Sequence, residues 1–238
     1  MKRIVVHHHL GLGDHLICNG LVNHLAETWD VVYLACKRAY YPTIACLYSD
    51  QPAVNVFTVQ DERQDVDRFA RDVDAEVLRI GFDRCDRSRF DESFYEQLGI
   101  PFEYRYTKFR LPARIPGEDA LFSALNPGSR FIVIHREWSH GLFVLRVGSA
   151  LPAVDIRRRS GDVFTNLLAY RRLIQEAAEI HCINSSVIHL VDSLETGGRL
   201  FYHDVRDRDF QLRRQWATVE YGARPMRVFL ARVRRVFA

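Results

Sequence analysis

The chain has 238 residues, a length that corresponds to one large domain or two small ones and argues against a short disordered peptide or a repeat array. Hydrophobic residues make up 47% and aromatic residues 12% of the chain, which is enough for a sizeable core. Lysine and arginine number 33 against 30 aspartates and glutamates, so the formal charge of +3 argues against a protein that coats nucleic acid.

The cysteine content favours a reducing compartment. The five cysteines are odd in number and form no CxxC pair, so we expect neither a disulfide framework nor a zinc site, and we expect a cytoplasmic protein. The apolar run that starts at Ile4 stops at His7, which is too short for a signal peptide. No stretch approaches the ~20 apolar residues of a membrane span.

Strand and helix patterns alternate through the first half of the chain. Residues 4–8 predict a strand, residues 10–14 a glycine-bearing turn, and the apolar spacing from Leu16 to Leu25 a helix. Further strands are predicted at 31–35, 54–59 and 76–80, and a short helix at 90–98. This order is typical of an α/β domain with a parallel sheet.

A second unit follows a proline-interrupted segment at 104–117, so we divide the chain into domains at 1–115 and 116–238. Here we predict strands at 131–135, 179–183 and 200–203, with a polar turn at 136–141. We also predict two helices. The first starts at an N-terminal cap at 165–166 and ends near residue 178, and the second starts after residue 186 and ends at the glycines 197–198.

The last residues have the spacing of a basic amphipathic helix. Apolar residues recur from Met226 to Phe237 with four arginines among and beside them. Two roles are open for such a helix: it packs across the two domains with its basic edge in solvent, or it lies on an anionic membrane surface. We favour the first.

The glycine turn after the first strand is the first candidate site. Gly11 and Gly13 precede a helix, so backbone N–H groups and the positive helix end meet where an anion or a closely approaching ligand would bind. Leu16 stands where a dinucleotide fingerprint needs a third glycine, so an NAD site is disfavoured. Asp14 is placed either as a general base or as a helix cap.

Histidines and an arginine lie at two strand ends. Successive side chains of a strand point to opposite faces, so at most His7 and His9 could bind the same metal ion. We favour a different arrangement, in which one or two of these histidines face a cleft and His15 joins them. His135 and Arg136 end the first strand of the second unit, the usual place of ligand-facing residues in an open α/β sheet. Arginine there suits phosphate, although a surface arginine is an equal alternative.

Asn184, Ser185 and Ser186 lie between a strand and a helix. Their hydroxyl and N–H groups are placed to hold a diphosphate, whereas simple N-capping explains one serine without a ligand. The basic stretch at 157–161 approaches the same region or forms a solvated turn. His181 and His189 are more often core or interface residues than catalysts, and His203, at a strand end, is a weaker candidate.

Two segments together resemble bacterial glycosyltransferases of the GT-B type. Residues 9–20, HLGLGDHLICNG, are similar to the amino-terminal loop of heptosyltransferase-like enzymes, in which a Gly-Asp pair supplies the catalytic base. Residues 179–192, EIHCINSSVIHLVD, are similar to the donor-side segment of sugar transferases that act on surface polysaccharide. Between them, residues 134–136, IHR, resemble the strand end that meets the donor phosphate.

The resemblance implies two Rossmann-like domains that face each other across a cleft, in a chain shorter than ordinary members. It implies an inverting, metal-independent transfer from a nucleotide-sugar to a glycan or lipid-linked acceptor, with no further cofactor and no nucleic-acid partner. Asp14 would be the base, with Gly11, Gly13, His15 and Asn19 on the acceptor side. His135, Arg136, Asn184, Ser185 and Ser186 would bind the donor.

A non-catalytic function is the alternative hypothesis. A trimmed relative of this fold would act as a nucleotide- or sugar-binding partner in a polysaccharide-assembly complex, with Asp14 only capping its helix. An NAD-dependent oxidoreductase is disfavoured by the missing fingerprint.

Overall fold

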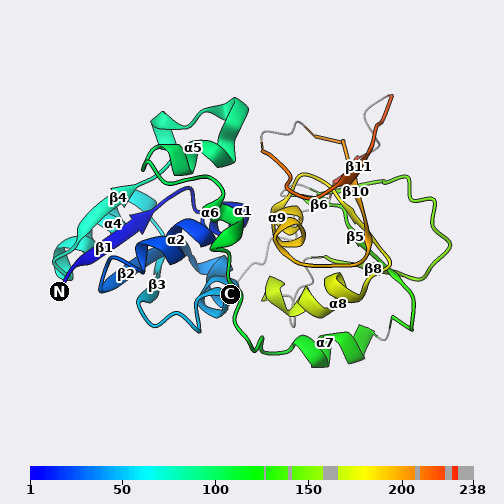
Figure 1. Ribbon diagram of the computed structural model, residues 1–238, viewed down its shortest axis with the longest axis horizontal. Helices are drawn as coiled ribbons and strands as arrows, with labels where there is room; N and C mark the ends of the chain where they lie inside the picture. The colour runs from blue at the N-terminus through cyan, green and yellow to red at the C-terminus, as the bar shows by residue number, and fades with distance from the viewer. Residues whose placement is uncertain (126, 139–140, 158–165, 207–209, 223–226, 230–238) are drawn as a thin grey trace, which may run out of the picture.

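The computed structural model describes the chain except for residues 126, 139–140, 158–165, 207–209, 223–226 and 230–238. It contains two sheets of parallel strands, one in each half of the chain, and the two halves lie side by side in Figure 1. The predicted α/β fold is confirmed.

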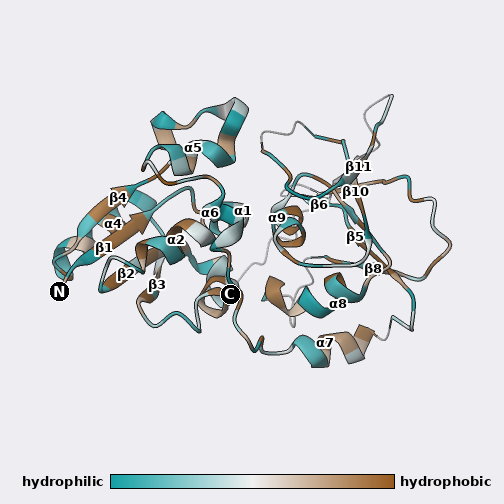
Figure 2. Cartoon of the chain, viewed as in Figure 1, coloured by the Kyte–Doolittle hydropathy of each residue, from teal (hydrophilic) through white to brown (hydrophobic). Residues whose placement is uncertain are grey.

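The first sheet has four parallel strands in the order β3-β2-β1-β4. Its strands are β1 (Arg3–His7), β2 (Val31–Lys37), β3 (Val54–Val59) and β4 (Glu76–Arg79), so all four predicted strands are confirmed. β1 is central and hydrophobic (Figure 2), and its successive residues face two different cores. Ile4 and Val6 face one core and Val5 the other, as the alternation of a strand between two helical layers requires.

Helices connect these strands. They are α1 (Leu12–Ile17), α2 (Asn19–Leu25), η1 (Arg38–Tyr40), α3 (Tyr41–Leu47), α4 (Glu62–Asp72), η2 (Phe82–Arg84), η3 (Arg87–Arg89), α5 (Phe90–Glu96) and α6 (Tyr104–Thr107). The single helix predicted up to Leu25 is wrong in detail, because it is interrupted at Cys18 and divides into α1 and α2. The glycine turn is also shorter than predicted, since α1 already begins at Leu12.

The second sheet has five parallel strands in the order β11-β10-β9-β5-β8. They are β5 (Ile132–His135), β8 (Ala153–Asp155), β9 (Glu179–Cys182), β10 (Arg199–His203) and β11 (Trp216–Val219). Helices α7 (Glu118–Leu125), η5 (Leu167–Tyr170), α8 (Arg171–Glu176) and α9 (Ser186–Ser193) accompany it. Three of these strands are predicted from the sequence, whereas β8 and β11 are not.

Two predictions for the second half are wrong. The polar turn predicted at 136–141 contains β6 (Glu137–Trp138) and the start of β7 (Gly141–Phe143), which pair antiparallel. β7 also pairs with β12 (Arg227–Phe229), so residues 227–229 of the predicted terminal helix form a strand whose edge completes a small sheet. The rest of that predicted helix, and most of the basic stretch at 157–161, lie outside the described residues.

The two halves share one core. Buried residues of α1, such as Ile17, belong to the same apolar cluster as Val187 and Ile188 of α9. Thr43 of α3 accepts a hydrogen bond from the backbone N–H of Leu167, 2.9 Å away. Among the described helices, none has the length and apolar content that crossing a bilayer would require.

Candidate active site between the two halves

A pocket of about 450 Å³ lies where the two halves meet. Its first-half lining is Gly11, Leu12, Gly13, Asp14, Ile17, Tyr40 and Phe90, and its second-half lining is His135, Glu137, Trp138, Leu167, Asn184, Ser185, Ser186, Val187, His189, Arg206 and Phe210. Several of these residues lie at the carboxyl end of β5 or within a few residues after β1, β9 or β10. The carboxyl ends of strands from both sheets therefore converge on the pocket, which is where open α/β sheets bind ligands.

Asp14 is held at the rim of this pocket by the start of α1. It is the third residue of the helix, half-buried, and its Oδ2 accepts a hydrogen bond from the backbone N–H of Gly11 over 3.0 Å. A Cβ atom at Gly11 would lie 2.5 Å from this oxygen, so a larger residue at position 11 would require the carboxylate to shift. The N-cap residue is Gly11 and not Asp14, so the alternative prediction is wrong in position. From the third helical position Asp14 still accepts from the N-cap backbone, and this contact holds its carboxylate at the pocket.

Gly13 brings the two halves into close contact. A Cβ atom there would lie 3.2 Å from Cδ2 of His189 and 3.6 Å from Cα of Ser186. The missing side chain thus lets α1 approach the first turn of α9. Residues 9–20 and 179–192, the two segments that resemble glycosyltransferases, are therefore neighbours in space.

His189 is a buried, neutral side chain of the pocket wall. Burial, together with the charge of Arg105 beside it, lowers the pKa of His189 well below its ordinary value. Its Nδ1 lies 3.1 Å from Nη2 of Arg105. Because a guanidinium only donates, Nδ1 accepts, and the single ring proton belongs on Nε2, on the side of Gly13.

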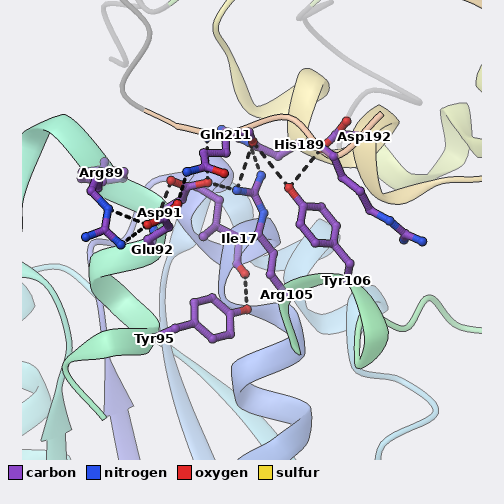
Figure 3. A network of polar contacts seen from close by, with 12 residues as sticks. Ile17, Arg89, Asp91, Glu92, Tyr95, Arg105, Tyr106, His189, Asp192 and Gln211 are labelled. Atoms are coloured by element: carbon purple, nitrogen blue, oxygen red, sulfur yellow. Dashed lines mark hydrogen bonds and ion pairs between the residues drawn. The ribbon is translucent and has the colours of Figure 1, made fainter. Parts of the chain in front are cut away.

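Figure 3 shows the polar network that holds Arg105 behind this wall. Arg105 is buried and forms an ion pair with buried Asp91 of α5. Oδ2 of Asp91 also accepts from the backbone N–H of Gln211 over 3.1 Å. The adjacent Tyr106 donates to Oδ2 of Asp192 in α9 over 3.2 Å. Helices α5 and α6 are therefore joined to the second half by partly buried hydrogen bonds.

The segment between β9 and α9 forms the opposite side of the pocket. Ser185 is the N-cap residue of α9 by its backbone, but its hydroxyl makes no capping hydrogen bond. Oγ of Ser185 is buried and has no hydrogen-bond partner within the described residues. N-capping therefore does not explain this serine, and its hydroxyl can bind a ligand in the pocket.

His135 lines the pocket, whereas Arg136 does not. Nδ1 of His135 lies 2.9 Å from the carbonyl oxygen of Ile156, and burial lowers the pKa of this histidine. Arg136 directs Nε and Nη2 to the same Oδ2 of Asp155, at 2.9 and 2.8 Å. Of this predicted donor pair, the pocket lining contains only the histidine.

Two predicted acceptor-side residues are buried beneath the pocket. His15 is fully buried against His8, with ring centroids 4.4 Å apart. Asn19 is also fully buried, and its Oδ1 accepts from Nδ2 of Asn23 and from the backbone N–H of Arg110. Both side chains contribute to packing of the first half and are not part of the pocket lining.

His7 and His9, at the end of β1, contact Phe82. Nε2 of His9 accepts from the backbone N–H of Phe82 over 2.8 Å, and the ring of His7 lies 4.9 Å from that of Phe82. Within the described part of the chain, no group of three His, Cys, Asp or Glu side chains is arranged to hold a metal ion.

Several lining residues had no signal that singled them out in the sequence. Tyr40, Phe90 and Phe210 come from loops or helix starts with no motif of their own. Arg206 lies just beyond the predicted strand at 200–203, so the rule that ligands bind at carboxyl strand ends applies to it as well.

No protein-family model and no curated protein matches the chain. Solved structures do match it. The glycosyl transferase family 9 structure from Veillonella parvula superposes with a TM-score of 0.56 at 11% identity, covering 92% of this chain and 87% of that one. The E. coli ADP-heptose LPS heptosyltransferase II gives a TM-score of 0.55 at 12% identity, covering 92% and 90%.

A third structure, the iron-containing dodecameric glycosyltransferase TibC from enterotoxigenic E. coli, gives a TM-score of 0.54 at 14% identity, covering 85% of this chain and 58% of that one. The chain has the GT-B fold of these glycosyltransferases. The predicted heptosyltransferase-like resemblance is thereby confirmed at the level of the fold.

Proposed function

We propose that this protein is a glycosyltransferase that moves a sugar from a nucleotide-activated donor to a hydroxyl group of a growing surface glycan. The observation that carries the proposal is the pocket between the halves, which has the carboxylate of Asp14 on one side and the Ser185 hydroxyl on the other. The fold is that of enzymes with this class of reaction, one of which is named for ADP-heptose and lipopolysaccharide.

In this proposal Asp14 is the general base. Its carboxylate accepts the proton of the acceptor hydroxyl, and the hydroxyl oxygen forms a bond to the anomeric carbon. The bond between that carbon and the diphosphate oxygen breaks on the opposite face, and its electron pair leaves with the diphosphate. A single displacement of this kind inverts the anomeric configuration. The hydrogen bond from Gly11 keeps the carboxylate in place.

The donor's phosphates would lie against residues 184–186. Ser185 offers an unpaired hydroxyl, and the first backbone N–H groups of α9 point out of the helix beside it. These donors face the position where negative charge develops as the diphosphate leaves. The proposal includes no resident metal ion, in accord with the family resemblance.

The test compares Asp14→Asn with Asp61→Asn. Both aspartates accept a hydrogen bond from a backbone N–H at a helix start, but Asp61 caps α4 and is not part of the pocket lining. An amide oxygen still accepts such a bond, so both variants should fold. We expect Asp14→Asn to lower kcat by at least about 100-fold, with donor binding nearly unchanged, and Asp61→Asn to retain activity.

The assay is release of nucleoside diphosphate from ADP-, UDP- and GDP-sugars with truncated lipopolysaccharide as the acceptor. Equal activity of the Asp14→Asn variant and the parent would remove Asp14 from the role of base. Nucleotide binding without transfer by the parent protein would favour the non-catalytic binding module instead.

The location and the acceptor also belong to this proposal. We propose a cytoplasmic enzyme, on the basis of the cysteine content. The proposal also includes peripheral membrane contact through the basic segment from Met226 to Phe237, of which the structure describes only residues 227–229. Liposome flotation with and without residues 224–238 tests it.

A further inference from the structure

We propose that Arg206, and not Arg136, is the cation that binds the donor's phosphates; this inference rests on the proposed function. Arg206 follows β10, is half-buried, and lines the pocket. It is the one arginine or lysine in the described lining of that pocket. A donor with two phosphates needs positive charge there, and the structure assigns that role to the loop after β10.

Two contacts hold the Arg206 side chain in place, and a third holds its backbone. Nη1 donates to the carbonyl oxygen of Asn184 over 3.0 Å. The guanidinium carbon lies 5.4 Å from the centre of the Trp138 ring. The backbone carbonyl of Arg206 accepts from the hydroxyl of buried Tyr202 over 3.3 Å. The head group is therefore fixed next to residue 184 before any ligand arrives, which lowers the entropy cost of binding.

The charge of Arg206 has no counter-ion within the described part of the chain. No ion pair joins it to a described carboxylate, and its polar contact is a neutral carbonyl. Arg136 is the opposite case, since it and Arg157 share the carboxylate of Asp155. Arg136 thus shares its charge with a carboxylate and lies outside the pocket lining, whereas Arg206 lines the pocket without a described counter-ion.

The neighbours of Arg206 fit a phosphate group. Asn184, whose carbonyl Arg206 contacts, is followed by Ser185, whose buried hydroxyl has no partner in the described residues. A guanidinium presents parallel N–H groups that match two phosphate oxygens, and a hydroxyl adds a third donor. The ligand class is thus a diphosphate ester, and Arg206 would stabilise it most strongly once the sugar bond has broken.

The experiment titrates inorganic pyrophosphate, ADP, UDP and GDP into the full chain by calorimetry, in parallel with Arg206→Gln, Arg206→Lys and the matched control Arg136→Gln. We expect the glutamine substitution at 206 to weaken diphosphate binding by at least about tenfold, since hydrogen bonds to charged groups have this magnitude. Arg206→Lys should retain part of the affinity, and Arg136→Gln should bind as the parent does.

Tryptophan fluorescence gives an independent readout. Because Trp138 lies under the guanidinium and lines the pocket, diphosphate binding should change the emission of the parent protein, and Trp138→Phe should remove that change. Circular dichroism and thermal unfolding verify that each variant is folded.

The outcomes separate this inference from the proposed function. Diphosphate binding that is equal in the parent and in Arg206→Gln overturns the role of Arg206 and leaves the donor site intact. Binding lost in Arg136→Gln instead assigns the role to Arg136. A parent protein that binds none of the four probes at millimolar concentration overturns the proposed donor site, and the role of Arg206 with it.

Discussion

Arg105 of α6 and His189 of α9 come from opposite halves of the chain, and Nη2 of the arginine lies 3.1 Å from Nδ1 of the histidine. The histidine is part of the pocket wall, and the arginine is also paired with Asp91. The junction of the halves and the wall of the candidate site therefore share one buried guanidinium.

Loss of Arg105 should destabilise the protein strongly. Arg105→Met keeps much of the apolar stem but leaves Asp91 buried without its counter-ion, which typically costs about 3–5 kcal/mol. The free energy of unfolding from urea titration measures this cost.

Arg199→Met is the matched control. Arg199 pairs with Glu179, but its side chain is 72% exposed, so we expect a loss below about 1 kcal/mol. Similar losses for the two variants would show that the Arg105 pair is no more important than a surface ion pair.

Gly20 should not tolerate a methyl group. A Cβ atom there would lie 1.9 Å from the carbonyl oxygen of Tyr104, so α2 and α6 would have to separate. Overpacking of this kind costs about 1–3 kcal/mol and outweighs the helix propensity that alanine adds, about 1 kcal/mol. Thermal unfolding of Gly20→Ala should show a lower Tm.

Gly148→Ala is the control for that substitution. No atom lies within 4 Å of the Cβ position at Gly148, so the free energy of unfolding should change by less than about 0.5 kcal/mol. An unchanged Tm in Gly20→Ala would mean that α2 and α6 leave room for a methyl group between them.

Buried histidines should make the fold less stable as the pH falls below 6.5. Burial lowers the pKa of His8 to about 4 and that of His203 to about 4. Well above pH 6.5 both histidines are neutral in the folded and unfolded states, so they contribute no pH dependence there. Between 6.5 and about 4 the unfolded chain binds protons that the folded chain does not, and the stability decreases.

For fully buried His8 the slope should be about 1.4 kcal/mol per pH unit over this range. Urea titrations at several pH values measure the slope, and His8→Leu should reduce it. A slope that His8→Leu leaves unchanged would show that this ring is protonated in the folded state.

The sequence predicted the strands best where burial imposes an uninterrupted apolar run, as in residues 4–6 and 132–134. It missed β11, of which Ala217 and Thr218 are exposed. The terminal helix was wrong at residues 227–229 because the pairing of β12 with β7 depends on a partner far away in the chain. Local periodicity contains no information about such a partner.

The candidate site was predictable where it follows a strand. Asp14 and Ser185 were found this way, and the structure brings their segments together across Gly13. Arg136 also follows a strand, but it pairs with Asp155 of a strand that was not predicted and lies outside the pocket lining. Position in the sequence therefore indicated the correct edge of the sheet. Only the tertiary contacts show which of Arg136 and Arg206 lines the pocket.

The hydroxyls of Ser185 and Ser193 should affect different properties. Oγ of Ser185 makes no hydrogen bond within the described residues, so Ser185→Ala removes no bond and should leave the free energy of unfolding unchanged or slightly higher. Oγ of Ser193 donates to the carbonyl of His189 over 2.9 Å, so Ser193→Ala should cost about 1 kcal/mol.

Ligand binding should show the reverse order. If the Ser185 hydroxyl is reserved for a donor phosphate, Ser185→Ala should weaken pyrophosphate binding by about fivefold, the value of one neutral hydrogen bond. Ser193→Ala should bind as the parent does, since this serine is not part of the pocket lining. Parallel urea and calorimetric titrations measure both properties. A Ser185→Ala variant that loses stability but keeps its affinity would mean that this hydroxyl has a structural partner and no ligand.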